Sequence, residues 1–291
     1  MRVAIYSRGL EKDQLEEIQL LIDELQSQSI DPVFYKEFFD RDGNRLQLKN
    51  PPRTFSTHAE LTDTDFLISL GGDGTLLDTI TLVRDKNIPV LGINFGRLGF
   101  LASMGKEELH TAVVSLAERT FVIDKRTLLH LDANTDVFGE TPYALNEFAI
   151  LKKDTSSMIK IHTYLNGEFL NTYWSDGIIV STPTGSTGYS LSCSGPIVFP
   201  DSGSFVITPV APHNLNVRPI VVPDNNIMSF EVEGRTDQFI CTLDSRKAIV
   251  NKDVQLAVRK EQFTISLIRL NENNFLQTLR NKLSWGLDKR N

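Results

Sequence analysis

Apolar and polar positions alternate in two different ways along the 291 residues, and the change falls near residue 120. Before that point, short apolar runs alternate with segments that have apolar residues at helical spacing. We expect strands at Val3–Ser7, Val33–Phe38, Phe66–Leu70 and Val90–Ile93, helices at Asp13–Gln26, Leu76–Lys86 and Lys106–Glu118, and a loop over 40–58. This alternation predicts an α/β fold with a doubly wound, mostly parallel sheet covered by helices on both faces.

After residue 120, strand-like runs follow one another without helices between them. The expected strands are Leu128–Asp132, Tyr143–Leu151, Ile159–Leu165, Glu168–Thr172, Gly177–Ser181, Ser204–Thr208, Ile220–Val222, Ile227–Glu233, Phe239–Leu243, Val254–Val258 and Thr264–Ile268. Asn166-Gly167 between two of them is a hairpin signal. The pattern predicts an all-β region of two packed sheets, a β-sandwich.

A last helix is expected at Asn273–Leu283, with Phe275, Leu276, Leu279 and Leu283 on one stripe. Such a stripe must be buried, and we expect the helix to pack back on the first domain. The predicted domains are therefore 1–119 plus 270–291, of α/β type, and 120–269, the β-sandwich.

Composition is that of an ordinary soluble globular protein, with 41% hydrophobic and 23% charged residues. The formal charge of −7 argues against broad nucleic-acid binding, which needs a basic surface. Two cysteines without a CxxC pattern predict a reduced compartment and neither a disulfide framework nor a metal cluster. The sequence has no long apolar stretch of the kind found in secretion signals or membrane spans, so we expect a cytoplasmic protein without membrane contact.

The most informative motif is a glycine turn directly after the expected strand Phe66–Leu70. It reads Gly71-Gly72-Asp73-Gly74-Thr75 and precedes a helix. A strand-to-helix turn at the carboxyl edge of a parallel sheet is where α/β proteins bind phosphorylated ligands, and glycine lets ligand oxygens approach the backbone. Asp73 can accept a proton, hold a metal or bind a sugar hydroxyl. The alternative is a plain turn in which Asp73 or Thr75 caps the helix.

Three further stretches carry candidate polar residues. The segment Thr182–Ser192 is rich in hydroxyls, which suit a ligand with sugar and phosphate oxygens, although a flexible surface loop has the same composition. Asn146-Glu147 interrupts a strand-like run, where a carboxylate usually faces solvent. His213 lies in a loop, where a lone histidine is usually incidental. Walker A, GxGxxG and GxSxG patterns are absent from the sequence.

Taken together, these stretches resemble the NAD kinase family. GGDGT is followed in order by the pair NE, then SDGIIVSTPTGSTGYSLS, then PVAPHNLNVRP, so the resemblance covers nearly the whole chain. GGDGT alone is shared with lipid kinases and phosphofructokinases, whereas the conjunction is specific. The family fold is an α/β domain followed by a β-sandwich. The resemblance identifies 1–119 plus 270–291 as the nucleotide-binding domain and 120–269 as the NAD-binding domain.

The resemblance also implies an activity and site residues. The family transfers the γ-phosphoryl of ATP to the 2′-hydroxyl of the adenosine ribose of NAD, giving NADP, with a divalent metal. It implies that Asp73 is the proton acceptor, that Gly72 and Gly74 approach the diphosphate, and that Asn146 and Glu147 bind the adenosine half. The remaining substrate contacts would come from Trp174, Asp176, Thr187, Gly188, Tyr189, Ser190, Leu191 and Ser192, with His213 a possible donor-site residue. A neighbouring subunit completes the family site, which implies a homodimer or homotetramer.

Three positions depart from the family pattern. Trp174 stands where many members have Arg or Lys, so a positive contact is missing there. Gly188 replaces the commoner alanine. Ser194 stands where glycine is usual before Gly195-Pro196, so a serine would have to adopt a positive φ.

Several alternatives stay open. The carboxylates do not suggest a dedicated metal cage, so Mg²⁺ is expected to be carried on ATP phosphate oxygens and water. Asp73 is either the base or a positioner of metal or hydroxyl. The donor is ATP, another triphosphate or polyphosphate, and NADH is an open acceptor. A diacylglycerol-type lipid kinase shares the glycine turn, although the hydroxyl-rich segment argues against it. A non-catalytic NAD(H)-binding module is the other rival.

Overall fold

A computed structural model describes residues 1–11, 14–153, 158–270 and 275–285. Contacts within the chain divide it into two compact units. The first unit is Met1–Lys125 with Ile265–Asn291, and the second unit is Arg126–Thr264. Each unit has its own hydrophobic core, so each is described by itself.

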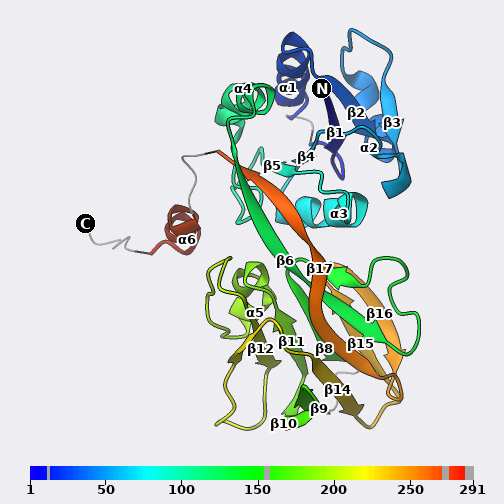
Figure 1. Cartoon of the computed structure of the whole chain (residues 1–291), viewed down its shortest axis with the longest axis vertical. Helices are drawn as coiled ribbons and strands as arrows, with labels where there is room; N and C mark the ends of the chain where they lie inside the picture. Colours follow the sequence, from blue (N-terminus) through cyan, green and yellow to red (C-terminus); the bar gives the residue numbers. More distant parts are fainter. Residues whose placement is uncertain (12–13, 154–157, 271–274, 286–291) are drawn as a thin grey trace. The chain divides into compact units, whose positions relative to one another are not determined.

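The first unit is built on a parallel sheet (Figure 1). Its strands are β1 (Arg2–Tyr6), β2 (Asp31–Tyr35), β3 (Arg53–Phe55), β4 (Phe66–Leu70) and β5 (Val90–Ile93). Their order is β5-β4-β1-β2-β3, and every neighbouring pair is parallel. From β1 the chain adds β2 and β3 on one side, and it then adds β4 and β5 on the other side of β1. This order confirms the doubly wound sheet. The winding reverses between β1 and β4, and ligands bind at the carboxyl ends of the strands at such a point.

Helices cover both faces of this sheet. They are α1 (Leu15–Ser27), α2 (Lys36–Arg41), α3 (Asp73–Val83) and α4 (Leu109–Glu118), and α1 and α4 lie side by side (Figure 1). Val3 and Ile5 of β1 share one core cluster with buried residues of α1 and α4. Side chains alternate between the two faces of a strand, so Ala4 points to the other face. The buried apolar residues of α3 lie outside that cluster, as expected of a helix on this other face.

Three predictions for the first unit were wrong. Phe38 lies in α2 and not in a strand, and its ring is 6.5 Å from that of Phe34. A short apolar run does not distinguish a strand from a helix turn. The segment 40–58 is not all loop, because it contains β3, the parallel partner of β2, and two short 3-10 turns. Helix α3 ends at Val83, earlier than expected, where Arg84 takes a φ of 47°.

The second unit contains two sheets whose inner faces form one core. The first sheet has the order β13-β12-β11-β8-β15-β16, and the second contains β10-β9-β14-β17 with β6 and β7. The bounds are β6 (Val122–Ala133), β7 (Tyr143–Ala144), β8 (Glu147–Lys152), β9 (Ile159–Leu165), β10 (Glu168–Ser175), β11 (Gly177–Ser181), β12 (Ser204–Val210), β13 (Ile220–Pro223), β14 (Met228–Glu233), β15 (Gln238–Leu243), β16 (Arg246–Asn251) and β17 (Leu256–Arg269). The rings of Phe148 on β8 and Phe230 on β14 meet across the sheets at 6.0 Å, which confirms the sandwich.

Local details of the second unit differ from the sequence pattern in three places. The expected strand Tyr143–Leu151 is broken between Ala144 and Glu147. The expected strands 254–258 and 264–268 are one strand, β17, and β16 was missed. The Asn166-Gly167 hairpin is confirmed, because β9 and β10 pair antiparallel and the two turn residues have φ of 52° and 83°.

The C-terminal helix α6 (Phe275–Leu283) belongs to the first unit. Its predicted start, 273–274, lies outside the described residues. Leu279 is buried, as the stripe predicts, whereas Leu276 is 48% exposed and does not contribute to it. Side chains of α6 line a pocket together with Leu98 and Gly99 of the loop that follows β5.

Candidate functional site

The first candidate region lies where the winding of the parallel sheet reverses. Strand β4 ends at Leu70 and is followed by the glycine turn, and β1 ends at Tyr6 and is followed by Ser7-Arg8-Gly9. Because β1 and β4 are parallel neighbours, these two loops leave the same edge of the sheet side by side. The topology therefore puts the motif at the edge where α/β sheets bind their ligands.

The glycines of the turn have different physical roles. Gly71 has a φ of +146°, and a Cβ there would crowd the Thr75 side chain, so this glycine is required by the fold. Gly72 is extended, and the nearest atom to a Cβ at that position would be Asn94 Nδ2 at 3.7 Å. A Cβ on Gly74 would lie 3.5 Å from Arg8 Nη1. The fold therefore leaves space over Gly72, where a ligand can approach the backbone, whereas the Arg8 guanidinium lies beside Gly74.

Asp73 is the first residue of α3, and its carboxylate is held by backbone amides of the loop after β5. Oδ2 accepts a hydrogen bond from the Phe100 N–H at 2.8 Å. Oδ1 accepts from the N–H groups of Leu101 at 3.0 Å and Ala102 at 2.9 Å. A carboxylate oxygen has about two acceptor positions, so Oδ1 is fully used and Oδ2 keeps one. The carboxylate is thus fixed in place with one lone pair left for a further donor.

The loop that holds Asp73 was not predicted as part of the site. Gly99 lies so close to Asp73 that an added Cβ would overlap Oδ1, and its N–H bonds to the Ala102 carbonyl at 2.8 Å. The glycines in Asn94-Phe95-Gly96-Arg97-Leu98-Gly99 were the available signal for a tight turn. Their function, enclosing a carboxylate from another loop, is visible only in the structure.

The second unit positions Asn146 and Glu147 through a carboxylate from the turn between β15 and β16. Asp244 accepts hydrogen bonds from three consecutive N–H groups, those of Leu145 at 2.9 Å, Asn146 at 2.7 Å and Glu147 at 3.2 Å. Leu145 and Asn146 lie in the break between β7 and β8, and Glu147 is the first residue of β8. Asp244 is the shared acceptor of these N–H groups. It was also missed from sequence.

Glu147 faces inward toward the hydroxyl-rich segment. Its Oε2 atom is buried without a hydrogen-bond partner among the described residues, and a Cβ on Gly188 would lie 3.3 Å from it. Burial, with Asp244 repulsion adding to it and the Tyr189 N–H opposing it, raises the pKa of Glu147 to about 8. A protonated carboxyl can both donate and accept a hydrogen bond, which suits a ligand hydroxyl or amine.

Replacing Glu147 with glutamine should change how stability depends on pH. The folded pKa of Glu147 lies above its unfolded value, so this group favours folding below about pH 4.5 and opposes it increasingly as pH rises toward 8. Between these values the wild-type unfolding free energy should fall by about 1 kcal/mol per pH unit because of this group. In Glu147→Gln that component is absent. Urea unfolding at pH 5, 6, 7 and 8 measures the difference, and parallel curves for the two proteins would refute it.

The hydroxyls of Thr182–Ser192 mostly bond within the second unit. Thr182 Oγ1 donates to the Leu145 carbonyl at 2.6 Å, and Ser190 Oγ pairs with Thr208 Oγ1 at 2.8 Å in the interior. Thr187 Oγ1 donates to the Thr184 carbonyl at 3.2 Å. The segment forms a 3-10 turn, Thr184–Thr187, and the short helix α5 (Tyr189–Ser192). Its hydroxyls therefore build an ordered turn, and a ligand would meet mainly its backbone and the side chains of Tyr189, Leu191 and Ser192, which are at least partly accessible.

Trp174, Asp176 and His213 come together at the end of β10. The His213 N–H donates to the Trp174 carbonyl at 2.8 Å, and Asp176 Oδ1 lies 2.6 Å from Lys152 Nζ. Trp174 is 44% exposed, and Lys160 Nζ on the paired strand β9 lies 5.0 Å from its ring centroid. A cation is therefore present beside the tryptophan. Burial raises the pKa of Tyr189, and the charges of Cys193, Asp176 and Glu147 raise it further.

The turn before Gly195 has the strain that the sequence predicts. Ser194 has a φ of 66°, a region that favours glycine. Its N–H donates to the Leu191 carbonyl at 3.0 Å, and a Cβ on Gly195 would overlap Ser190. The departure from the family pattern at residue 194 is thus accommodated by an unfavourable backbone conformation that closes α5.

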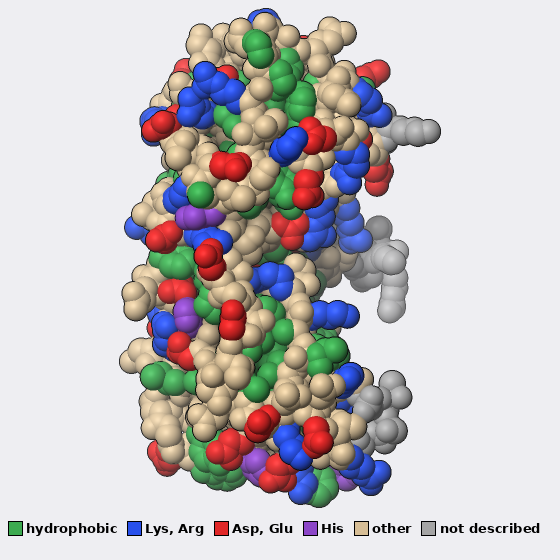
Figure 2. All heavy atoms as spheres, turned by 90° about the vertical axis from the view of Figure 1, so that its right-hand side faces the viewer, with side chains coloured by type: hydrophobic (Ala, Val, Ile, Leu, Met, Phe, Trp, Pro, Cys, Tyr) green, Lys and Arg blue, Asp and Glu red, His purple; other side chains and the backbone are tan. Residues whose placement is uncertain are grey.

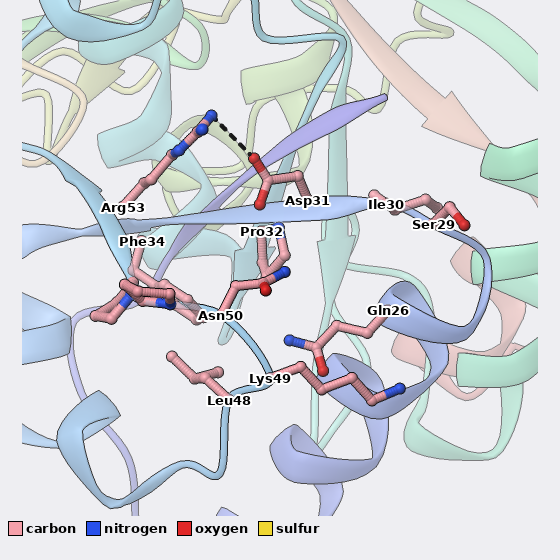
Figure 3. A pocket seen from close by; sticks show the side chains of 12 residues that line it. Gln26, Ser29, Ile30, Asp31, Pro32, Phe34, Leu48, Lys49, Asn50 and Arg53 are labelled. Carbon is pink, nitrogen blue, oxygen red and sulfur yellow. Dashed lines mark hydrogen bonds and ion pairs between the residues drawn. The ribbon is translucent and has the colours of Figure 1, made fainter.

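Other surface features do not compete with these regions. A pocket lined by Asp31, Lys49 and Arg53 lies at the start of β2, the opposite end of the strand from the glycine turn (Figure 3). Acidic and basic side chains are intermingled on the face drawn in Figure 2. The whole chain has a formal net charge of −7. Within the described ranges, no three His, Cys, Asp or Glu residues gather as a metal site, and no helix is long and apolar enough to cross a membrane.

Two family models match this chain. The N-terminal domain model of ATP-NAD kinases matches residues 30–121, and the C-terminal domain model matches residues 145–270. The chain belongs to the NAD kinase family. NAD kinases of Cytophaga hutchinsonii and Flavobacterium psychrophilum are 48% and 45% identical to it, each over 100% of both chains. Both models are NAD kinase models, so the lipid kinase alternative is not favoured.

Solved structures agree with this NAD kinase fold. Yeast NADH kinase complexed with NADH superimposes with a TM-score of 0.87 at 22% identity, covering 99% of this chain and 89% of that one. An NAD kinase from Archaeoglobus fulgidus in complex with ATP gives 0.75 at 24% identity, covering 98% and 99%. At these identities the superpositions show a shared fold, namely a parallel-sheet domain followed by an antiparallel one.

Proposed function

We propose that this protein transfers the γ-phosphoryl group of ATP to the 2′-hydroxyl of the adenosine ribose of NAD, giving NADP and ADP. Family membership supports the activity, and the arrangement of Asp73 supports the chemistry. A single carboxylate is fixed by three N–H groups at the ligand edge of a doubly wound sheet, beside backbone that is open to approach. Phosphoryl transfer depends mainly on such positioning and on charge stabilisation.

In the proposed reaction, Asp73 Oδ2 accepts the proton of the 2′-hydroxyl. The ribose oxygen then forms a bond to the γ-phosphorus while the bond from that phosphorus to the β,γ-bridging oxygen breaks, and ADP leaves. Oδ2 is the acceptor because Oδ1 already receives two N–H groups. As the resemblance to the family implies, we assign Asn146, Glu147, Tyr189 and Asp176 to binding of the dinucleotide. The same carboxylate that orients the hydroxyl takes its proton.

A divalent ion fits this site only as a companion of the donor. Asp73 is a lone carboxylate, and the described residues bring no further acidic pair together with it. Mg²⁺ commonly keeps water and substrate phosphate oxygens as most of its ligands. When bound with ATP, it would neutralise charge on the phosphates, while the residues of this chain hold the ribose and the carboxylate.

An NADP-forming assay tests the activity directly. The purified full-length protein is incubated with NAD, ATP and Mg²⁺, and NADP is measured with an NADP-specific dehydrogenase. Parallel reactions replace NAD with NADH and ATP with polyphosphate. Tight NAD binding by calorimetry without NADP formation under any of these conditions would contradict the proposal and favour a non-catalytic NAD(H)-binding module.

Replacing Gly72 with valine tests the approach of the diphosphate. The fold should tolerate the change, because the backbone is extended at Gly72 and a Cβ would have its nearest neighbour at 3.7 Å. The valine side chain would fill the space in which the phosphates approach, so nucleotide affinity should fall by about tenfold or more, equivalent to about 1.4 kcal/mol. Calorimetric titration with NAD and with Mg-ATP measures this. Unchanged affinity for both, with an unchanged melting temperature, would disprove the proposed approach.

We further propose a homo-oligomer with a shared site, located in the cytoplasm. Large apolar side chains are exposed around the edge strand β13, namely Phe199, Leu215 and Val221, of which Leu215 is 89% exposed. Cys193 and Cys241 are free thiols, as expected in a reducing compartment. Light scattering coupled to gel filtration measures the assembly. A monomer at assay concentration that turns over NAD would exclude a site that depends on a second subunit.

A further inference from the structure

Arg8 lies beside the glycine turn and is not among the residues that the family motifs single out. It follows β1, in the loop next to the one that carries Asp73. Its Nη2 donates to the Gly74 carbonyl at 3.1 Å, and Nη1 lies 3.5 Å from the place of a Cβ on Gly74. A guanidinium group is therefore in contact with the first turn of α3, at the edge of the sheet where the ligand phosphates are proposed to lie.

The guanidinium is held in one orientation by neighbouring groups. Arg8 Nε and Nη2 both bond to the Asp78 carboxylate, at 2.5 Å and 2.7 Å, and Asp78 also accepts from the Tyr6 hydroxyl at 3.0 Å. The backbone carbonyl of Arg8 accepts a hydrogen bond from Arg41. Both ends of the residue are therefore fixed, which lowers the entropy lost when it binds a ligand.

Two donors of this side chain remain available. Arginine has five N–H donors, of which the Nε–H and the two on Nη2 are used by Asp78 and the Gly74 carbonyl. The two on Nη1 have no hydrogen-bond partner within residues 1–11, 14–153, 158–270 and 275–285. The side chain of Arg8 is 52% exposed. A fixed cation with two free, accessible donors matches the paired oxygens of a phosphate group.

The acidic side chains near the glycine turn also favour a cation beside it. Asp73 is the first residue of α3, Asp78 lies five positions further along, and Arg8 contacts both the Gly74 carbonyl and Asp78. Asp73 is surrounded by neutral backbone N–H groups, and Arg8 is the partner of Asp78. Arg8 offsets one of these two negative charges beside the glycine turn.

We propose that Arg8 binds the phosphates of the triphosphate donor through Nη1, with Asp78 acting only to orient it. This inference rests on the proposed function for the identity of the donor. It assigns Arg8 to the ATP side of the reaction, so Arg8 contributes to the KM for ATP much more than to the KM for NAD.

Calorimetry on the full-length protein with Mg-ATP and with tripolyphosphate tests the proposal. Arg8→Ala should weaken binding of both by about tenfold to a hundredfold, because charge-assisted hydrogen bonds are lost. Arg8→Lys should recover part of the loss, since lysine keeps the charge without the fork of donors. Arg53→Ala, which removes an exposed, ion-paired arginine at the opposite end of the sheet, should leave affinity within about threefold, the range expected for a distant screened charge.

Asp78→Asn separates phosphate binding from a structural ion pair. If Arg8 binds phosphate, removing the acidic partner should leave ATP affinity within about threefold of wild type or improve it. An equal loss in Asp78→Asn and Arg8→Ala, or binding by Arg8→Ala within about threefold of wild type, would overturn the proposal. Tripolyphosphate binding is read without any NAD turnover. A failure of this inference is therefore distinguishable from a failure of the kinase assignment, which shows as absent NADP formation by the wild type.

Discussion

Replacing Asp73 with asparagine should lower kcat by a factor of about 10²–10⁴, the usual contribution of a positioned general base. The amide is isosteric, and its oxygen can keep the two hydrogen bonds from Leu101 and Ala102. Its NH₂ group would face the Phe100 N–H, so one acceptor becomes a donor. We therefore expect a stability loss of about 1–2 kcal/mol together with the loss of turnover. Steady-state NADP formation and urea unfolding measure the two effects.

A matched variant separates catalysis from charge and stability in this experiment. Asp85→Asn makes the same chemical change just beyond the other end of α3, at an exposed position, and should retain turnover. The assay temperature must lie below the unfolding transition of Asp73→Asn, so that only folded protein is compared. A kcat within threefold of wild type for Asp73→Asn would show that the carboxylate neither accepts the proton nor positions the hydroxyl.

Replacing Asp244 with alanine should lower the unfolding free energy by about 2–4 kcal/mol. Three consecutive N–H groups, those of Leu145, Asn146 and Glu147, would lose their acceptor at once. Part of this cost is offset, because Asp244 also repels the Glu147 carboxyl and its removal relieves that repulsion. The net effect is a loosened break between β7 and β8, so NAD affinity should fall as well. Urea unfolding and NAD titration measure both.

Two further variants, one at residue 244 and one at a control position, make the interpretation more specific. In Asp244→Asn the amide oxygen keeps the acceptor position shared by Asn146 and Glu147, whereas its NH₂ faces the Leu145 N–H, so the loss should be smaller than with alanine. Asp253→Ala removes an exposed acid from the same unit and should be close to neutral. An unfolding midpoint for Asp244→Ala equal to that of Asp253→Ala would contradict the role given to this carboxylate.

The sequence predicted the parallel sheet and the glycine turn because both depend on local chemistry. An apolar run that ends in Gly71-Gly72-Asp73-Gly74 allows few conformations, and Gly71 with a φ of +146° shows why glycine is needed there. The hairpin at Asn166-Gly167 and the positive φ of Ser194 were predicted for the same reason. Where a residue type has few backbone options, one position is enough to predict the structure.

The predictions of secondary structure were wrong where one sequence pattern fits two different structures. Phe38 continues an apolar run that fits a strand or a helix turn, and its packing on Phe34 selects the helix. The expected strands 254–258 and 264–268 left out Arg259, Lys260 and Glu261, yet β17 continues through them. There Arg259 pairs with Asp132 and Glu261 with His130, so cross-strand partners far away in sequence stabilise the charged residues.

Residues that act on the backbone were the ones missed at the site. Asp244 binds three amides, Arg8 binds a carbonyl of the glycine turn, and the Phe100–Ala102 amides bind Asp73. Such contacts require only an acceptor or donor at the right place and leave no motif in the sequence. The opposite error applies to Thr182–Ser192, where hydroxyls that suit a ligand serve largely to close an internal turn.

The long sequence separation between Asp244 and the amides that it binds affects when this part of the protein can fold during synthesis. The amides that it binds lie 97 to 99 positions earlier in the chain. During translation, Leu145–Glu147 leave the ribosome long before their acceptor has been synthesised. A nascent or prematurely terminated chain leaves these amides solvated, so competence to bind dinucleotide is acquired late in biosynthesis.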